Sequence, residues 1–586
     1  MKQFITFINE TLQAAFEACQ YDAKYGKAIL SNRPDLCQYQ CNGALSAAKT
    51  YKKSPFSIAS EVSTILKKSP YFKEVNCVMP GFINLTINDA LIASYINEMA
   101  CHPKYGCDEI GQNQTIIVDY GGPNVAKPLH VGHLRTAIIG ESIKRLGNFL
   151  GYHMLGDVHL GDWGLQIGLI IAELHRRQPC LVYFDENYNG TYPENPPFTI
   201  SELEEIYPAA STFAKKTPWF MKQAKEITYQ FQNGHKGYVA LWQHILKVSI
   251  TDLKKNYENI NVSFDLWKKE SDAQPYIPQM IEDLKQKGFA YLDQGALIID
   301  VKQSTDQKEI PPCILVKSDG ATLYSTTDLA TIVERMALYK PKEIMYIVDK
   351  RQSMHFEQVF RCAQKTGLVT PETKLTFLGF GTMNGKDGKP FKTRDGGVMR
   401  LEHLIQEVSD QVYNRMIENK TIEASKAKEI SKQVGIAALK YGDLSNQIAK
   451  DYLFDLERFT SFEGNTGPYI LYTVVRIYSI LNKCQSKRVE VYDIQCPTDE
   501  VERDLMLKIL QFNEVLTNSF LEYTPHRICQ YIYELSNIFN RFYHQSKIIT
   551  ETDPIKQASW LKLISLTKDL LVCSLDLLGI EVPNQM

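Results

Sequence analysis

The sequence contains no apolar run near the eighteen or so residues that a membrane-spanning helix needs. Its first twenty residues, MKQFITFINETLQAAFEACQ, mix apolar side chains with glutamates and other polar ones. They predict an amphipathic helix and lack the unbroken apolar segment of a signal peptide. We also find no internal repeat and no low-complexity tract. We therefore expect a globular protein of the cytoplasm, without a membrane partner.

Paired cysteine spacings and a strong net charge are also missing. Thirteen scattered cysteines fit a reducing compartment with free thiols. Cys37 and Cys41 are close together, but no second Cys/His pair with zinc-ligand spacing lies near them, so we expect no zinc. The formal net charge of −2 neither requires nor excludes nucleic acid, because RNA binding needs only a local basic surface.

The chain has 586 residues, of which 44% are hydrophobic and 23% charged, and this length predicts about three or four domains. Residues 1–112 combine helical patterns with a strand-like run, Phe82 to Ile87, after the turn Pro80-Gly81, and predict a small α/β domain. Residues 401–586 show only helical patterns, at 426–450, 466–484, 501–518, 525–547 and 559–578.

The middle part, residues 113–400, predicts a parallel sheet. Thr115 to Asp119 is a buried-strand run, a helical pattern ending at Gly151 follows, and His153 to Val158 is strand-like again. A second half repeats this alternation, with strands at 321–325, 343–348 and 374–380 and helices at 328–339 and 355–366. A mostly helical insertion at about 175–265 separates the halves. Such a sheet binds ligands at the carboxyl ends of its strands.

The strongest local signal is the segment from Pro123 to Leu134, PNVAKPLHVGHL, between the first strand and its helix. His130 and His133 project from nearly the same side of the helix start, where ring N–H groups, free backbone amides and the helix dipole suit polyphosphate. Gly132 leaves room for a flat base. The two histidines could instead bind a metal or form a satisfied structural pair. Their place after a strand and before a helix favours nucleotide binding.

His130-Val131-Gly132-His133 resembles the HIGH signature of class I aminoacyl-tRNA synthetases, and the block from Pro123 to Arg135 resembles the bacterial arginyl-tRNA synthetases in particular. Further blocks of that family occur in order over most of the chain. They are Gly161 to Gly164, Tyr324 to Ala330, Gln352 to His355, Phe391 to Arg394, Lys440 to Leu444, Phe462 to Thr466 and Leu577 to Ile580.

The resemblance implies an α/β protein with a Rossmann-like class I synthetase catalytic core, an N-terminal tRNA-contacting domain and an all-helical C-terminal anticodon-binding domain. It implies ATP-dependent activation of L-arginine to arginyl-adenylate and transfer of arginine to tRNA(Arg). ATP is then a substrate that brings Mg²⁺, and we expect a monomer. We expect no editing domain, because a site for a planar guanidinium rejects lysine strongly.

An arginine site needs carboxylates in bidentate geometry and a neutral acceptor. The resemblance implies that Glu270, Tyr324 and Asp328 hold the guanidinium, and that Asp119, Asn124 and Gln352 hold the α-amino and carboxylate groups. Taken alone, Asp328 could be a helix N-cap after a strand ending near Ser325, and Asp119 a solvated strand end.

Catalysis should come from positioning and from cations or N–H donors around the phosphates. His130, His133 and Lys127 are the leading candidates. The KMSKS loop of the class corresponds here to Pro390 through Arg394, PFKTR, in which both signature lysines are replaced. The resemblance implies that Lys127 supplies the missing charge, and Lys392 and Arg394 could contribute, although a solvated basic loop is the simpler interpretation.

Residues for tRNA are harder to identify. Aromatic and amide side chains of the helical part could stack on or bond to unpaired bases, although most aromatics at helical spacing are core. The candidates are Asn465, Tyr472, Asn540 and Tyr543, with Phe82 and Asn84 in the N-terminal domain.

Three other functions agree less well with the sequence. A small nucleotidyltransferase would be shorter, and a non-catalytic RNA-binding paralogue would be expected to have lost the histidines, Asp328 or Gln352. A synthetase for cysteine would need a metal-ligand cluster in its pocket, and one for glutamate would need a basic pocket. The predicted acidic residues of the amino acid site argue against both.

Overall fold

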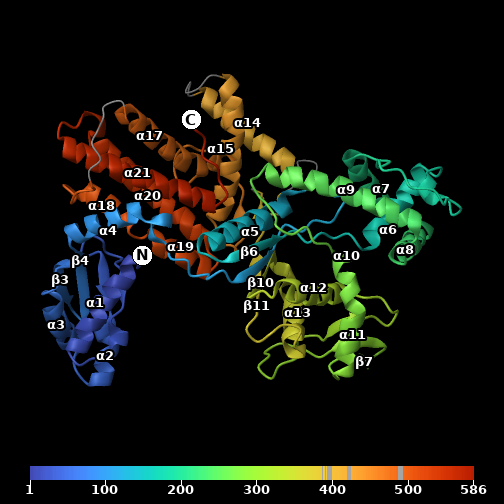
Figure 1. The fold of residues 1–586 in the computed structure, drawn as a ribbon, viewed down its shortest axis with the longest axis horizontal. Coiled ribbons are helices and arrows are strands. Elements are labelled where there is room, and N and C mark those ends of the chain that lie inside the picture. The colour runs from blue at the N-terminus through green and yellow to red at the C-terminus, as the bar shows by residue number, and fades with distance from the viewer. Residues whose placement is uncertain (128, 386, 390, 392–398, 419–423, 486–492) are drawn as a thin grey trace. The chain divides into compact units, whose positions relative to one another are not determined.

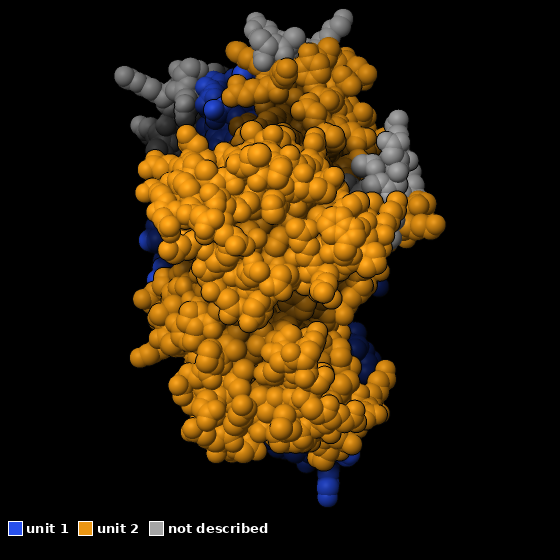
Figure 2. Space-filling model, turned by 90° about the vertical axis from the view of Figure 1, so that its right-hand side faces the viewer, with its two compact units in different colours: residues 1–110, 461–577, 582–586 blue, residues 111–460, 578–581 orange. Residues whose placement is uncertain are grey.

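The structure is a computed structural model that describes residues 1–127, 129–385, 387–389, 391, 399–418, 424–485 and 493–586. The chain forms two compact units (Figure 2). Unit 1 contains residues 1–110, 461–577 and 582–586, and unit 2 contains residues 111–460 and 578–581. None of the described helices is both long enough and apolar enough to span a bilayer.

The N-terminal part of unit 1 is an antiparallel sheet with helices. Its strands, in the order β1-β2-β4-β3, are Ala28–Leu30, Tyr39–Cys41, Phe82–Ile87 and Phe72–Val78. Its helices are α1 Phe4–Ala18, α2 Gly43–Tyr51, α3 Pro55–Leu66 and α4 Asp89–Cys101. Strand β4 has the bounds that the sequence predicts. Ile83, Leu85 and Ile87 are buried on one side of this strand, as its alternation requires.

The C-terminal part of unit 1 is helical: α17 Gly467–Gln485, α18 Glu500–Ile509, α19 Phe512–Leu521, α20 Pro525–Gln545 and α21 Pro554–Leu577. The prediction of one helix over 501–518 is wrong, because the chain turns between α18 and α19 at Leu510 and Gln511. Both residues keep dihedral angles near the helical region, and neither glycine nor proline stands at the break. The sequence therefore offers no local signal for it.

Unit 2 is built on a four-stranded parallel sheet (Figure 1) in the order β11-β10-β5-β6. The strands are Lys374–Phe380, Glu343–Asp349, Thr115–Asp119 and His153–Asp157. This confirms the predicted parallel sheet, and β5 and β11 have the predicted bounds. Helices α5 Val131–Phe149, α6 Leu165–Arg177, α12 Tyr324–Tyr339 and α13 Ser353–Thr366 belong to the same unit. Ile117, Leu329 and Ile344 share one core, so α12 packs on the sheet.

One predicted strand, 321–325, is wrong. Helix α12 begins at Tyr324, and only Thr322 pairs, in an isolated bridge with Val316. The Thr326 hydroxyl donates to the Leu315 carbonyl and accepts from the Leu323 amide, 3.3 Å away, which stabilises the helix start. Asp328 therefore lies one turn inside α12 and is no N-cap.

The remaining elements of unit 2 surround this sheet. The insertion forms α7 Ile200–Lys216, α8 Pro218–Gln232 and α9 Lys236–Glu258, and is followed by α10 Glu270–Ala273 and α11 Ile277–Gln286. A small antiparallel sheet of β7 Tyr291–Asp293, β8 Ala296–Ile299 and β9 Cys313–Val316 was not predicted. Helices α14 Leu401–Glu418, α15 Ala424–Leu444 and α16 Leu456–Phe459 belong to this unit, as do the paired strands β12 Met383–Asn384 and β13 Tyr452–Leu453.

Candidate active site

A cavity of about 580 Å³ opens at the carboxyl ends of β5 and β10. Its lining comes from these strand ends, the start of α5, the turn after β6 and the segment after β11. The predicted residues that line it are Asp119, His130, Gly132, His133 and Gln352. The cavity lies where a parallel sheet presents ligand-binding side chains.

The two histidines face the cavity as neutral hydrogen-bond donors. Their ring centroids are 3.9 Å apart, and each Nδ1 accepts from a backbone amide: His130 from Gly132 at 3.0 Å and His133 from His130 at 3.2 Å. The proton of each neutral ring is therefore on Nε2. Burial lowers the pKa of His133 to about 3 and also lowers the pKa of His130. Both Nε2–H groups can donate to an anion at neutral pH.

The expectation that free backbone amides complete this phosphate site is wrong. The His130 and Gly132 amides bond to the histidine rings, the Val131 amide donates to the Met399 carbonyl at 3.1 Å, and the His133 amide donates to the His130 carbonyl. The ring nitrogens thus replace the amides as donors. A Cβ at Gly132 would lie 2.8 Å from the His130 ring, so glycine is required by the ring's position.

Of the three basic candidates, only Lys127 is among the described residues, and it does not line this cavity. The Lys127 ammonium lies 4.6 Å above the ring of Tyr207 in α7, and Lys127 is not among the described residues that line the cavity. Lys392 and Arg394 lie outside the described residues. Phe391, beside them in the sequence, does line the cavity and packs on Phe454.

Asp119 ends β5 and is buried, so its interpretation as a solvated strand end is wrong. Its Oδ2 accepts from Nη2 of Arg335 at 2.5 Å, and the same Nη2 donates to Asp157 at 2.7 Å. Asn124 is exposed and bridges to Gly161 beyond the end of β5. Gln352 is exposed at the cavity rim, in the turn after β10.

Three carboxylates, those of Glu270, Asp162 and Asp328, lie close enough to influence one another beside this cavity. Glu270 begins α10, and its amide donates to the Leu160 carbonyl at 3.0 Å. Burial, with Asp162 and Asp328 nearby and His159 opposing them, raises the pKa of Glu270 to about 7. A bound cation stabilises the ionised form of such a group of carboxylates.

The other two predicted guanidinium residues lie on α12. Asp328 accepts a hydrogen bond from Nε2 of His355 at 2.5 Å, and this bond raises the pKa of the histidine. Tyr324 opens the helix with 74% of its side chain exposed.

A metal ion has one geometric candidate among the described residues. Asp119, Asp157 and His159 offer ligand atoms within 4.8 Å of one another. The guanidinium of Arg335 is already bonded to both carboxylates, so a cation there would meet a fixed positive charge.

Unit 1 brings three of the predicted tRNA residues together. The guanidinium of Arg476 lies 4.8 Å from the ring of Tyr472 and 5.5 Å from that of Tyr543, and its Nη1 donates to Asn540 at 2.6 Å. Asn465 lies in the turn before α17.

In the N-terminal sheet of unit 1, Phe82 is half-buried at the start of β4. Asn84 is buried and accepts from Gln40 at 2.9 Å.

Sequence reasoning missed Arg335, Asp157, His159 and Arg476. Arg335 follows Asp328 by seven residues on α12, which places both on one helix face, and this spacing was the available signal. Asp157 is the second-last residue of the predicted strand His153 to Val158, and His159 lies two residues before the Gly161 to Gly164 block. Their convergence could not be read from the sequence, because it depends on strand order.

Three family models match the chain. They are "tRNA synthetases class I (R), catalytic domain" at residues 96–456, "DALR anticodon binding domain" at 470–586 and "Arginyl tRNA synthetase N terminal domain" at 2–87. The chain is 57% identical to the arginine–tRNA ligase of Alkaliphilus oremlandii and 55% identical to that of Agathobacter rectalis, over the full length of both chains in each case.

Solved structures resemble it as well. The arginyl-tRNA synthetase of Plasmodium falciparum superposes with a TM-score of 0.83 at 25% identity, and that of Thermus thermophilus with 0.79 at 20%; the second likeness concerns the fold alone. Both alignments cover all of each chain. The parallel sheet, the His-x-Gly-His helix start and the catalytic-domain match define a class I aminoacyl-tRNA synthetase. Within that class, the chain belongs to the arginine–tRNA ligase family.

Proposed function

We propose that the cavity at the carboxyl edge of the parallel sheet is where arginine is activated with ATP before its transfer to the 3′ end of tRNA(Arg). The observation that carries this proposal is the pairing, at one sheet edge, of two neutral histidine donors with a group of carboxylates. Donors suit the phosphates of ATP, and carboxylates suit a substrate that is cationic at two groups.

In the first step, an oxygen of the arginine carboxylate attacks the α-phosphorus of ATP, and pyrophosphate leaves. His130 and His133 donate through Nε2 to the phosphate oxygens, where negative charge develops. Gly132 keeps the base side of the cavity open. Lys127, Lys392 and Arg394 add positive charge around the phosphates, and Lys127 reaches them by leaving the Tyr207 ring.

The amino acid is held at both ends. Glu270, Tyr324 and Asp328 receive the guanidinium, while Asp119, Asn124 and Gln352 receive the α-amino and carboxylate groups. In the second step, the 2′-hydroxyl of the terminal ribose of the tRNA attacks the activated carbonyl, and AMP leaves. Neither step requires a covalent bond to the protein.

The proposal extends to the rest of the chain. Mg²⁺ enters with ATP. Residues 1–112 and 401–586 contact tRNA(Arg) through Phe82, Asn84, Asn465, Tyr472, Asn540 and Tyr543, and residues 113–400 form the catalytic domain. The protein acts as a monomer in the cytoplasm. Sedimentation of the purified chain tests its oligomeric state.

The decisive experiment is charging of total tRNA by the purified protein, with each of the twenty amino acids offered separately alongside ATP and Mg²⁺. We expect arginine alone to be esterified. Esterification of another amino acid would contradict the carboxylate pocket, and tRNA binding without any charging would indicate a non-catalytic protein.

A further inference from the structure

A buried arginine links the two sides of the amino acid site. Arg335 on α12 is only 1% exposed, and its Nη2 donates to the Oδ2 atoms of Asp119 and Asp157. Its guanidinium also lies 5.3 Å from the ring of Tyr346 on β10. One nitrogen thus joins the carboxyl ends of β5 and β6 to the helix that contains Asp328.

The strand register explains why a cation is needed there. Asp119 and Asp157 are register partners at the ends of adjacent parallel strands, so their side chains emerge on the same face of the sheet. Two buried carboxylates at this spacing cannot both stay ionised without a positive partner. Arg335 supplies that partner and leaves the group of three with a net charge of −1.

The two aspartates are not equivalent. Asp157 is fully buried, and its Oδ1 accepts from the amides of His159 at 3.2 Å and Lys268 at 3.3 Å, so both of its oxygens are bonded. Asp119 lines the cavity, and among the described residues its Oδ1 has no hydrogen-bond donor. Asp119 therefore keeps one oxygen for a ligand, whereas Asp157 serves only the fold.

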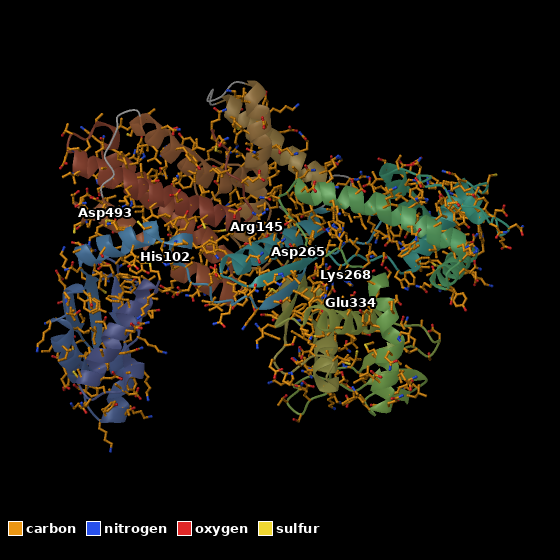
Figure 3. The ribbon with its side chains drawn as sticks, viewed as in Figure 1. His102, Arg145, Asp265, Lys268, Glu334 and Asp493 are labelled. Atoms are coloured by element: carbon orange, nitrogen blue, oxygen red, sulfur yellow. The ribbon has the colours of Figure 1, made fainter. Side chains whose placement is uncertain are left out.

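Arg335 lies on the same face of helix α12 as Tyr324 and Asp328, the residues proposed to bind the guanidinium. Tyr324, Asp328 and Arg335 are separated by four and seven residues, which places them within about 40° of one another around the helix. The neighbouring Glu334 bonds to Lys268 at 2.7 Å, and Figure 3 shows these two residues close together beside α12. The helix that presents Asp328 thus also fixes the orientation of Asp119.

We propose that Arg335 is a positioning residue that holds the Asp119 carboxylate in place for the α-ammonium group of the substrate. The inference rests on the proposed role of Asp119 and extends it to a residue that does not line the cavity. The Nε and Nη1 atoms of Arg335 are buried and bond to no described residue, so Nη2 alone makes the hydrogen bonds that orient the two carboxylates.

Charge makes the proposal testable by pH. The groups that face Asp119 are Arg335, His159, Asp157 and Tyr346. Burial raises the pKa of Asp119, Arg335 and His159 oppose this, and Asp157 adds to it. Without Arg335 the two carboxylates share a proton, and a neutral Asp119 cannot attract an ammonium. The loss of arginine affinity should therefore grow as the pH falls.

The experiment compares arginine with 5-guanidinopentanoate, which lacks the α-amino group, in tRNA charging by the full-length chain. We expect R335Q to raise the KM for arginine roughly 10- to 100-fold, the range of a charge-assisted hydrogen bond, and to leave the inhibition constant of the analogue within about threefold. The ratio of variant to wild-type KM should be larger at pH 6.5 than at pH 8.

Three further variants keep the test informative. D157N in the R335Q background should restore much of the arginine affinity and abolish the added pH dependence, since it removes the competing carboxylate. R335K keeps the charge without the planar fork and should give an intermediate, still selective, loss. K268M breaks the neighbouring ion pair with Glu334 and should affect arginine and the analogue equally, as a control for helix packing.

The outcomes separate this inference from the function on which it rests. If D119N weakens arginine selectively but R335Q and R335K do not, the positioning role of Arg335 is overturned and the role of Asp119 stands. If D119N itself does not distinguish arginine from the analogue, the proposed role of Asp119 fails. Equal weakening of both ligands by R335Q would reduce Arg335 to a purely structural residue.

Discussion

His130 and His133 meet the cavity as uncharged rings whose Nδ1 atoms are fixed by backbone amides. A neutral donor keeps its Nε2–H over the whole neutral range, because the pKa of His133 is lowered to about 3 by burial. Phosphate binding by the His133 ring should then be insensitive to pH between 6 and 8.

His133→Ala tests this donor directly. Loss of one N–H aimed at developing phosphate charge should lower the rate of arginine activation roughly 10²- to 10³-fold. Pyrophosphate exchange in the presence of tRNA measures this, and tRNA binding should be unchanged. His244→Gln is the matched control, since His244 is a buried histidine bonded to Tyr183 away from the cavity. Equal losses in both variants would point to damage of the fold.

Protonation of Glu270, unlike that of His133, should make kcat/KM for arginine depend on pH. Its pKa is raised to about 7, so its carboxylate is ionised above this pH and protonated below it. A protonated Glu270 cannot hold a guanidinium, and kcat/KM for arginine should fall by up to about tenfold per pH unit below pH 7. Glu270→Gln should remove this acid limb and lower kcat/KM at pH 8. An unchanged pH profile in the variant would refute the assignment, and kcat/KM for ATP serves as the control.

At the scale of elements, the short helix α10 needs an outside support, because four residues cannot sustain a helix alone. Asp162 supplies it: this buried carboxylate accepts from the Ser271 amide at 3.0 Å and from the Ser271 hydroxyl at 2.7 Å. The Gly161 to Gly164 block thus acts on the site through the position of Glu270.

Asp162→Ala should therefore raise the KM for arginine about tenfold or more and leave the KM for ATP nearly unchanged, because only α10 loses its anchor. Ser271→Ala removes one of the two bonds and should give a smaller shift in the same direction. Steady-state charging assays with either substrate varied measure both effects. A rise in both KM values would indicate general loss of structure.

Some helices and strands could be predicted from the sequence, and others could not. Strands β5, β10 and β11 and helices α5 and α13 were predictable, because each is a strongly patterned run between clear turn signals. The start of α12 was not: Ala321 to Ser325 alternates as a strand would, and the Thr326 hydroxyl bonds decide for a helix. The break between α18 and α19 has no local signal at all.

For the whole molecule, we expect arginine activation to depend on tRNA. Arginine-driven pyrophosphate exchange should be weak with ATP and arginine alone and should rise when tRNA(Arg) is added. A non-cognate tRNA is the control. Strong exchange without any tRNA would contradict the prediction and would show that the catalytic unit is complete by itself.

The sequence by itself determined the class of fold, the order of its parts and the family, because strand and helix periods and the His-Val-Gly-His block are local in the chain. It also named Asp119, His130, His133 and Glu270. Only the tertiary structure decided what surrounds them. Arg335 reaches Asp119 across 216 residues and Asp157 across 178, and no local pattern encodes such pairs. Strand order and register set those contacts, and both arise from packing of the whole unit.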